Sequence, residues 1–296
     1  PFPGPGHSRA VGRRPMRLSA QRAHPHGRLG APPAPAPTRL ALVVGLIDEA
    51  AETAYGPRTE KEEPHMADKP TLVLVHGFWG GAAHWSDVIV ELNKRGYDKI
   101  RAVENPLTSL ADDAERTRKM IQQVDGPVVL VGHSYGGAVI TEAGDLPNVK
   151  ALVYIAAFAP DAGESPGQIT QENPPAAFDN IAPDSDGYLW IKQDKFHESF
   201  AQDLAPDQAL VMAVTQKAPV GSTFGDNVTA PAWRNKPVWY QVSTQDRMIH
   251  PDNERRMAQR MNPRKVIELE ASHASLASRP QAVVDLIEEA VRETSG

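Results

Sequence analysis

A serine flanked by glycines is the residue of this chain best placed to do chemistry. The 296-residue sequence contains the motif Gly132-His133-Ser134-Tyr135-Gly136, followed by one more glycine. The motif follows the apolar run 128–131 and precedes a small-residue segment, which is a strand–turn–helix context. A serine hydroxyl is a poor nucleophile until a base takes its proton, and a tight turn projects it where a base can reach it. The sequence therefore predicts a nucleophile at Ser134.

Two further residues follow in the order that such a nucleophile requires, first an acid and then a histidine. Asp246 comes just after the apolar run 238–243, and His273 comes just after the run 265–269. In the predicted roles, His273 takes the proton of Ser134 and later protonates the leaving group. Asp246 fixes the imidazole tautomer and stabilises its cation. Either residue alone would be unremarkable, but three such residues after three different strands indicate a catalytic triad.

A tetrahedral oxyanion also needs hydrogen-bond donors. The first apolar run ends in His76-Gly77-Phe78-Trp79-Gly80-Gly81, whose glycines allow a close approach of the backbone. We expect the backbone N–H groups of Phe78 and Tyr135 to form the oxyanion hole. His76 is interpreted as a structural residue of the same turn.

Strand-length and helix-length segments alternate from about residue 69 to the C-terminus, which predicts an α/β fold with a mostly parallel sheet and helices on both faces. The predicted strands are residues 71–76, 99–103, 128–132, 149–158, 238–243 and 265–269. The predicted helices are residues 85–95, 109–124, 136–144, 252–261 and 280–292, with Ser109 as a cap and Pro280 in a first turn. The charges in residues 112–119 are predicted to form a solvated helix face without function.

Residues 161–236 interrupt this alternation and are too long for a simple crossover. We interpret them as an inserted helical cap, with short helices at 195–204 and 207–218. Apolar walls of a substrate pocket are predicted from Trp79, Trp190, Phe196 and Met212. Phe200, Phe224 and Trp233 are further candidates, and for each of these side chains a place in the core of the cap is the favoured alternative.

The first 40 residues have a different composition from the rest. They hold nine Pro, five Gly and seven Arg but no Asp or Glu, whereas the remaining 256 residues hold 24 basic and 37 acidic side chains. Residues 1–65 are therefore predicted to be a disordered extension, and residues 66–296 a single domain. A targeting peptide within residues 1–65 is left open; otherwise we expect a cytoplasmic protein.

Several partners are not expected. The acidic domain argues against nucleic acid, and no apolar run approaches the roughly 18 residues of a membrane span. The chain has no cysteine, and its ten histidines show no metal-binding spacing, so neither a metal site nor a cofactor is predicted. The oligomeric state is left open, with a homodimer as one alternative.

Taken together, the motifs resemble those of an α/β-hydrolase. The similarity covers roughly the last three quarters of the chain and is closest to the plant methylesterase and hydroxynitrile lyase branch with its bacterial esterase relatives. The stretches that carry it are residues 74–81 with Trp85, the serine motif, residues 156–161, and the loops of Asp246 and His273. This resemblance implies a serine esterase that acts on a small carboxylic ester in a capped apolar pocket.

Known members of this branch also suggest alternatives. Hydroxynitrile lyases carry a lysine directly after the catalytic histidine, but this chain has Ala274 there, so we infer hydrolysis. Haloalkane dehalogenases use an aspartate as the nucleophile and are disfavoured by Ser134. A cofactor-free haloperoxidase-like perhydrolase with the same triad and a hydrolase-fold binding protein for a small molecule both remain open, because fold alone does not fix function.

Overall fold

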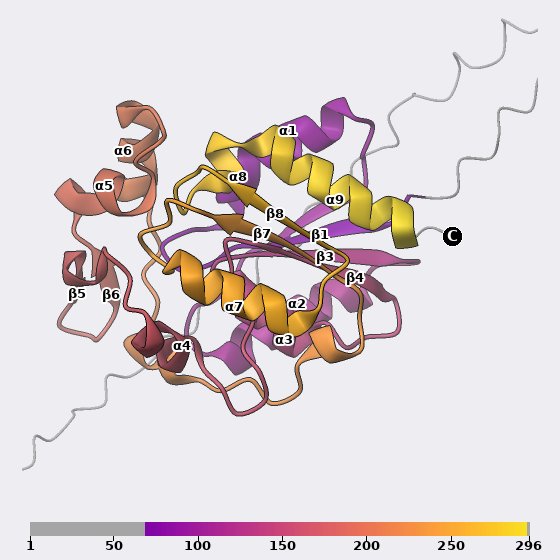
Figure 1. Cartoon of the computed structure of the whole chain (residues 1–296), viewed down its shortest axis with the longest axis horizontal. Helices are drawn as coiled ribbons and strands as arrows, with labels where there is room; N and C mark the ends of the chain where they lie inside the picture. The colour runs from indigo at the N-terminus through magenta and orange to yellow at the C-terminus, as the bar shows by residue number, and fades with distance from the viewer. Residues whose placement is uncertain (1–68, 295–296) are drawn as a thin grey trace, which may run out of the picture. The chain divides into compact units, whose positions relative to one another are not determined.

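A computed structural model describes residues 69–294, and the extension predicted for residues 1–65 lies outside the described residues. The described chain builds a six-stranded sheet in the order β2-β1-β3-β4-β7-β8, in which every neighbouring pair is parallel (Figure 1). Its strands are β1 (Thr71–Val75), β2 (Ile100–Val103), β3 (Val128–His133), β4 (Val149–Ile155), β7 (Val238–Ser243) and β8 (Lys265–Leu269). The predicted α/β fold with a parallel sheet is confirmed.

Helices cover both faces of the sheet (Figure 1). One face carries α1 (Ser86–Lys94), preceded by the 3-10 turn η1 (Ala82–Trp85), together with α8 (Ser275–Ser278) and α9 (Pro280–Thr294). The other face carries α2 (Leu110–Gln122), α3 (Gly136–Ala143) and α7 (Pro251–Met261). Alternate residues of β1 divide between the two cores, with Leu72 and Leu74 on the α1 and α9 side and Val73 and Val75 on the other.

Local chemistry explains where several elements begin and end. Ser109 caps α2 by accepting a hydrogen bond from the backbone N–H of Asp112, as predicted. Pro280 opens α9, also as predicted. Strand β4 ends at Ile155, three residues before its predicted end, because Ala156 has a positive φ of 43° and turns the chain out of the ladder.

One prediction about α2 is wrong. Its charged segment was expected to face solvent throughout, but Asp113 and Thr117 are completely buried. Both lie on the same helical stripe as the buried Leu110 and Ala114, because residues three, four and seven positions apart share one face. The helix therefore directs a carboxylate into the core beneath the serine motif.

The segment expected to form the cap lies between β4 and β7 and folds into short elements. These are α4 (Pro166–Glu172), η2 (Phe178–Asn180), β5 (Ile181–Pro183), β6 (Leu189–Ile191), η3 (Gln193–Lys195), α5 (Phe196–Phe200), α6 (Pro206–Val214), η4 (Gly221–Gly225) and η5 (Ala232–Arg234). The two helices expected at 195–204 and 207–218 are present as the shorter α5 and α6. The antiparallel β5–β6 hairpin was not predicted from the sequence. We call residues 161–236 the insertion.

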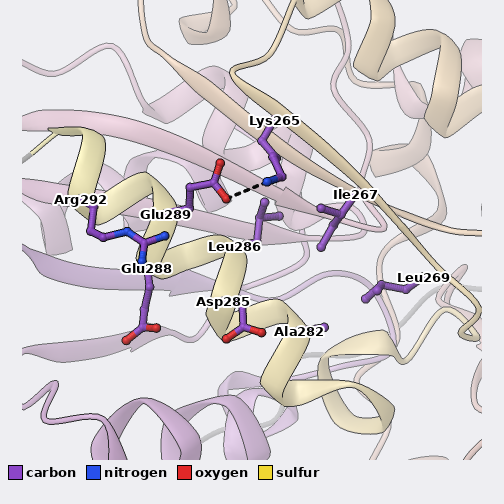
Figure 2. A pocket seen from close by; sticks show the side chains of 9 residues that line it. All are labelled: Lys265, Ile267, Leu269, Ala282, Asp285, Leu286, Glu288, Glu289 and Arg292. Atoms are coloured by element: carbon purple, nitrogen blue, oxygen red, sulfur yellow. Dashed lines mark ion pairs between the residues drawn. The ribbon is translucent and has the colours of Figure 1, made fainter.

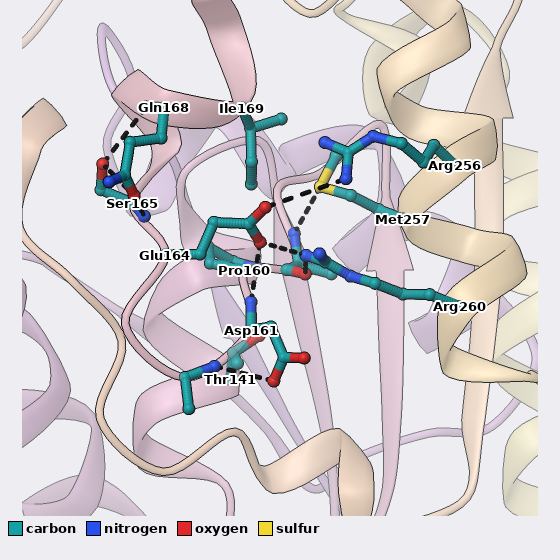
Figure 3. Close-up of polar contacts among 12 residues, drawn as sticks. Thr141, Pro160, Asp161, Glu164, Ser165, Gln168, Ile169, Arg256, Met257 and Arg260 are labelled. Carbon is teal, nitrogen blue, oxygen red and sulfur yellow. Dashed lines mark hydrogen bonds and ion pairs between the residues drawn. The ribbon is translucent and has the colours of Figure 1, made fainter. Parts of the chain in front are cut away.

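Ion pairs join the start of the insertion to α7 (Figure 3). Glu164 pairs closely with Arg260 and more distantly with Arg256, at 3.8 Å, and accepts a hydrogen bond from the Asp161 N–H at 2.9 Å. Arg260 also donates to the carbonyl of Ala159 at 2.5 Å. These contacts fix the point at which the insertion leaves the sheet.

Candidate active site

Ser134 occupies a sharp turn between β3 and α3. Its φ is +57°, a backbone conformation that costs a non-glycine residue about 1–3 kcal/mol. The turn is held because the Ser134 carbonyl accepts hydrogen bonds from the N–H groups of Gly137, at 2.9 Å, and Phe158, at 3.0 Å. A Cβ atom at Gly136 or Gly137 would collide with a backbone carbonyl, that of Val75 or Phe158 respectively. The glycines of the motif thus allow β1 and β4 to pass close to the start of α3.

The predicted acid and histidine lie together at the ends of their two strands. His273 Nδ1 is 2.5 Å from Asp246 Oδ2, and both side chains are fully buried. The other carboxylate oxygen, Asp246 Oδ1, accepts hydrogen bonds from the N–H groups of Met248, at 2.6 Å, and Ile249, at 2.8 Å. Since the carboxylate can only accept, Nδ1 of His273 donates and the lone pair of a neutral imidazole lies on Nε2.

His273 Nε2 is buried and has no hydrogen-bond partner among residues 69–294. The hydrogen bond between Ser134 and His273 is therefore not formed in this structure, although catalytic hydrogen bonds often tighten only when substrate binds.

His133, the residue before Ser134, links the serine turn to the loop of His273. Its Nε2 donates to the His273 carbonyl at 2.8 Å, and the two rings lie 4.8 Å apart. Burial, with the nearby His273, holds the pKa of His133 well below its usual value, so this imidazole stays neutral.

The two residues predicted to supply the oxyanion donors have side chains in contact with each other. The rings of Phe78 and Tyr135 are stacked, with centroids 3.9 Å apart and planes 12° apart. Neither backbone N–H group donates to an acceptor in the part of the chain that the structure describes. Two free N–H groups beside the nucleophile are what an oxyanion hole requires.

The predicted pocket residues are placed in different surroundings. Trp79 is buried and donates from its N–H to Lys217 O, at 3.0 Å, and from its indole to Leu189 O, at 2.8 Å. Phe196 and Met212 are buried within the insertion. Trp190, in contrast, is 40% exposed on the β5–β6 hairpin and donates to Asp184, so the structure does not bring it into the site.

Phe200 is the aromatic residue that reaches the histidine. Its ring lies 4.8 Å from that of His273 at 84°, an edge-to-face contact, and stacks on Phe196 at 5.0 Å. His84 also contacts Phe200, with ring centroids 5.9 Å apart. Burial lowers the pKa of His84 to about 4, so it too is neutral near pH 7. The rings of Phe200, His133 and His84 around this site are therefore uncharged.

A second buried carboxyl group lies behind the acid and was not found from the sequence. Glu254 of α7 is fully buried, and its Oε2 accepts a hydrogen bond from the Ser243 N–H at 3.0 Å. Burial and the neighbouring charge of Asp246 raise the pKa of Glu254 well above its usual value. Burial therefore favours the protonated form of Glu254, and Asp246 is the carboxylate that contacts His273.

Two surface grooves differ in their relation to the triad. One, of about 360 Å³, lies between β8 and α9 and is lined by charged and aliphatic side chains, among them the ion pair Lys265–Glu289 at 3.1 Å (Figure 2). It contains no triad residue. Another, of about 570 Å³, is lined by Asp246 together with Arg247 and Arg255.

Within residues 69–294, no cluster of His, Asp and Glu side chains could hold a metal ion, and no helix is both long and apolar enough to cross a bilayer.

Comparisons with known proteins bear on the family and the fold. The chain is 28% identical over 248 residues to the alpha/beta hydrolase nvfD of Aspergillus novofumigatus, covering 76% of this chain and 98% of that protein. It is 27% identical over 240 residues to methylesterase 8 of Arabidopsis thaliana, covering 73% and 88% of the two chains. The crystal structure of a pyrethroid hydrolase from Sphingobium faniae has a similar fold, with a TM-score of 0.64 at 20% identity over 75% of this chain and 97% of that one. The model of the alpha/beta hydrolase family matches residues 72–286, and this chain belongs to that family.

Proposed function

We propose that this protein is a serine hydrolase that cleaves a small, largely apolar carboxylic ester through an acyl-enzyme on Ser134. The observation that carries the proposal is the pairing of His273 Nδ1 with Asp246 at 2.5 Å, which leaves a buried and unpartnered Nε2 beside the serine turn. A lone pair in that position is suited to accept the serine proton. The two free N–H groups of Phe78 and Tyr135 complete the set of groups that acyl transfer requires.

In the first half of the proposed reaction, Ser134 Oγ attacks the ester carbonyl carbon while His273 Nε2 takes its proton. Negative charge develops on the carbonyl oxygen, and the N–H groups of Phe78 and Tyr135 stabilise it. Asp246 stabilises the imidazolium and keeps its ring in place. The tetrahedral intermediate then expels the alcohol, which leaves with the proton from His273, and the acyl group remains on Ser134.

In the second half, water attacks the acyl carbon and gives a proton to His273 Nε2. Collapse of the second tetrahedral intermediate returns that proton to Ser134 Oγ and releases the carboxylic acid. The charges that separate in this cycle are those of the His273 imidazolium and of the oxyanion, and Asp246 stabilises the imidazolium throughout. Every proton transfer thus passes through His273.

The substrate class follows from the groups around the histidine. Phe200 contacts the His273 ring. Phe224 of the insertion packs on Phe78 of residues 76–81, which we call the oxyanion loop, with ring centroids 4.7 Å apart. We propose that the insertion acts as a cap over an apolar ester, since aromatic walls favour apolar groups. The names of methylesterase 8 and the pyrethroid hydrolase are consistent with ester cleavage. Ala274, after the histidine, supplies no charge for a cyanide leaving group and favours hydrolysis.

Labelling with a fluorophosphonate, followed by peptide mapping, tests the nucleophile. The wild-type protein should be labelled at Ser134, and Ser134→Ala should lose both labelling and turnover of p-nitrophenyl acetate. Ser185→Ala, at an exposed site of the insertion, is a matched control that should behave as wild type. Labelling of another residue, or equal labelling of Ser134→Ala, would refute the mechanism.

The same assay separates the two alternatives. With an acyl donor and added hydrogen peroxide, the hydrolase should release carboxylic acid without accumulating peracid. Peracid as the main product would instead indicate a perhydrolase, and ligand binding without labelling or turnover would indicate a binding protein.

A further inference from the structure

Asp113 is a buried acid that the proposed reaction does not use. It lies on α2 with none of its surface exposed, and both of its oxygens are occupied. Oδ2 accepts a hydrogen bond from the Tyr135 hydroxyl at 2.8 Å, and Oδ1 accepts one from the Leu107 N–H at 2.8 Å. The acid therefore holds the side chain of the residue that follows Ser134.

The hydrogen bond from the Tyr135 hydroxyl to Asp113, which we call the tether, depends on the hydroxyl keeping its proton. Burial and the charge of Asp113 raise the pKa of Tyr135 well above its usual value, so its hydroxyl keeps its proton and donates. Hydrogen bonds to a charged acceptor are stronger than those between neutral groups. The position of the Tyr135 ring is thus set at its far end by Asp113 and at its near end by the serine turn.

The Tyr135 ring in turn supports the loop of the other oxyanion donor. Phe78 is 1% exposed and stacks on Tyr135 with ring centroids 3.9 Å apart, and Phe224 of the insertion also packs on Phe78, with ring centroids 4.7 Å apart. The Phe78 N–H makes no hydrogen bond to another described residue, so ring stacking is a principal restraint on where that N–H points. A shift of the Tyr135 ring would move the Phe78 side chain with it.

Asp113 also restrains the insertion. Leu107 has a positive φ of 63°, a strained conformation for a residue with a branched side chain. The hydrogen bond from its N–H to Asp113 holds it there, and its carbonyl accepts a hydrogen bond from the Val220 N–H at 3.0 Å. The Asp113 carboxylate therefore connects the serine turn, through Tyr135, with the segment of the insertion that leads from Val220 to Phe224, through Leu107.

We propose that Asp113 is a positioning residue for the oxyanion hole, which tethers Tyr135 and thereby keeps the backbone N–H groups of Tyr135 and Phe78 aimed at one point. This inference rests on the proposed acyl transfer at Ser134. Asp113 touches neither substrate nor the reacting atoms in this role. Its effect should therefore be on turnover, because an oxyanion hole stabilises charge that exists only in the transition state.

Three variants test the tether. Asp113→Leu removes the acceptor, Asp113→Asn keeps a polar partner for both Tyr135 and Leu107, and Thr117→Val is a matched control. Thr117 is buried one turn further along α2, and its hydroxyl has no hydrogen-bond partner among the described residues. Complete loss of one oxyanion donor lowers kcat by about 10²–10³-fold. We expect Asp113→Leu to lower kcat by about 10–10²-fold with KM within about threefold, because the donors are misdirected rather than removed.

The conservative and control variants should separate positioning from stability. Asp113→Asn should restore kcat to within a few-fold of wild type, and Thr117→Val should leave it unchanged. If Asp113→Leu lowers the melting temperature but leaves kcat unchanged well below that temperature, the proposal is wrong. If Asp113→Leu does not fold, Tyr135→Phe carries the same test, because it removes only the hydroxyl that binds Asp113.

A second measurement does not depend on ester turnover. Hydrogen exchange of the loop at residues 77–81 should accelerate in Asp113→Leu and not in Thr117→Val. Unchanged exchange would refute the tether even if the wild-type protein proved inactive. Conversely, faster exchange in Asp113→Leu, together with a wild-type protein that is not labelled at Ser134, would support the tether while refuting the proposed function.

Discussion

Gly77 lies against the nucleophile, and adding a methyl group there should disable the site. A Cβ atom built on Gly77 would be 2.5 Å from Ser134 Cβ, 2.9 Å from Ser134 Oγ and 2.9 Å from the His133 carbonyl oxygen. Non-bonded carbon atoms prefer about 3.5–4.0 Å, so Gly77→Ala requires a displacement of about 1 Å. None of the three neighbours is the flexible end of a long side chain, and the displacement must therefore fall on the serine turn or on the oxyanion loop.

The size of the effect follows from that displacement. A misplacement of 1 Å at a reacting group can lower the rate by about 10²-fold, which corresponds to about 2.7 kcal/mol of transition-state free energy. We expect Gly77→Ala to lose about this much kcat for p-nitrophenyl acetate and to react with a fluorophosphonate more slowly by a similar factor. Overpacking should also lower the free energy of unfolding by about 1–3 kcal/mol.

Gly225→Ala is the matched control. A Cβ atom at Gly225 would have no atom within 4 Å, and its φ is not in the left-handed region. Its turnover and labelling rate should equal those of wild type. Turnover of Gly77→Ala within about threefold of wild type, in a folded protein, would show that the close approach of the two loops does not position the serine.

Three other changes should have separable effects. Ser109→Ala removes the cap of α2 and should lower the free energy of unfolding in urea by about 1 kcal/mol without altering turnover. Trp79→Phe leaves the Leu189 carbonyl without its indole donor and should lower the melting temperature by about 2–4 °C, equivalent to about 1 kcal/mol. Burial favours the protonated form of folded Glu254, whereas the unfolded chain loses this proton above the ordinary pKa, so the burial of Glu254 destabilises the fold increasingly as pH rises above that value. Glu254→Gln should therefore become more stable relative to wild type as pH rises from 5 to 8, measured by urea unfolding at both values; a difference that does not change with pH would contradict the raised pKa of Glu254.

The sheet and the order of the catalytic groups were predictable because they depend on local signals. Strands β7 and β8 begin and end at their predicted residues, and Asp246 and His273 follow them directly. Neighbouring parallel strands bring their carboxyl ends to one edge, so the loops after β7 and β8 had to lie close together. The contact between Asp246 and His273 is the geometric result of that arrangement.

The burial of Asp113 was not predicted, although the sequence contained a signal for it. The run of charges around it is typical of a solvated face, yet its spacing from Leu110 and Ala114 places it on the buried stripe of α2. An acid on a buried stripe needs a partner, and that partner, Tyr135, lies 22 positions away. Helical periodicity could therefore have shown that Asp113 is buried, but not which residue binds it.

The insertion was the least predictable part because its contacts are distant in sequence. The β5–β6 hairpin places Trp190 on the surface, whereas Leu189 directs its carbonyl to Trp79, 110 positions away. The sequence of the hairpin contains a turn signal at Gly187, whose φ is +84°. That signal predicts a turn without indicating which side of the hairpin faces the site.

The two hydrogen bonds of Trp79 bear on how the substrate preference of such a protein can be changed. Both acceptors in the insertion, at Leu189 and Lys217, are main-chain carbonyls. Substitutions at these positions leave the carbonyls in place, so the side chains of the insertion can diversify while the oxyanion loop keeps its anchor. Deletions or changes of loop length in the insertion, by contrast, would shift the carbonyls themselves. Redesign of substrate range in this scaffold is therefore best confined to side chains, with the length of the insertion held constant.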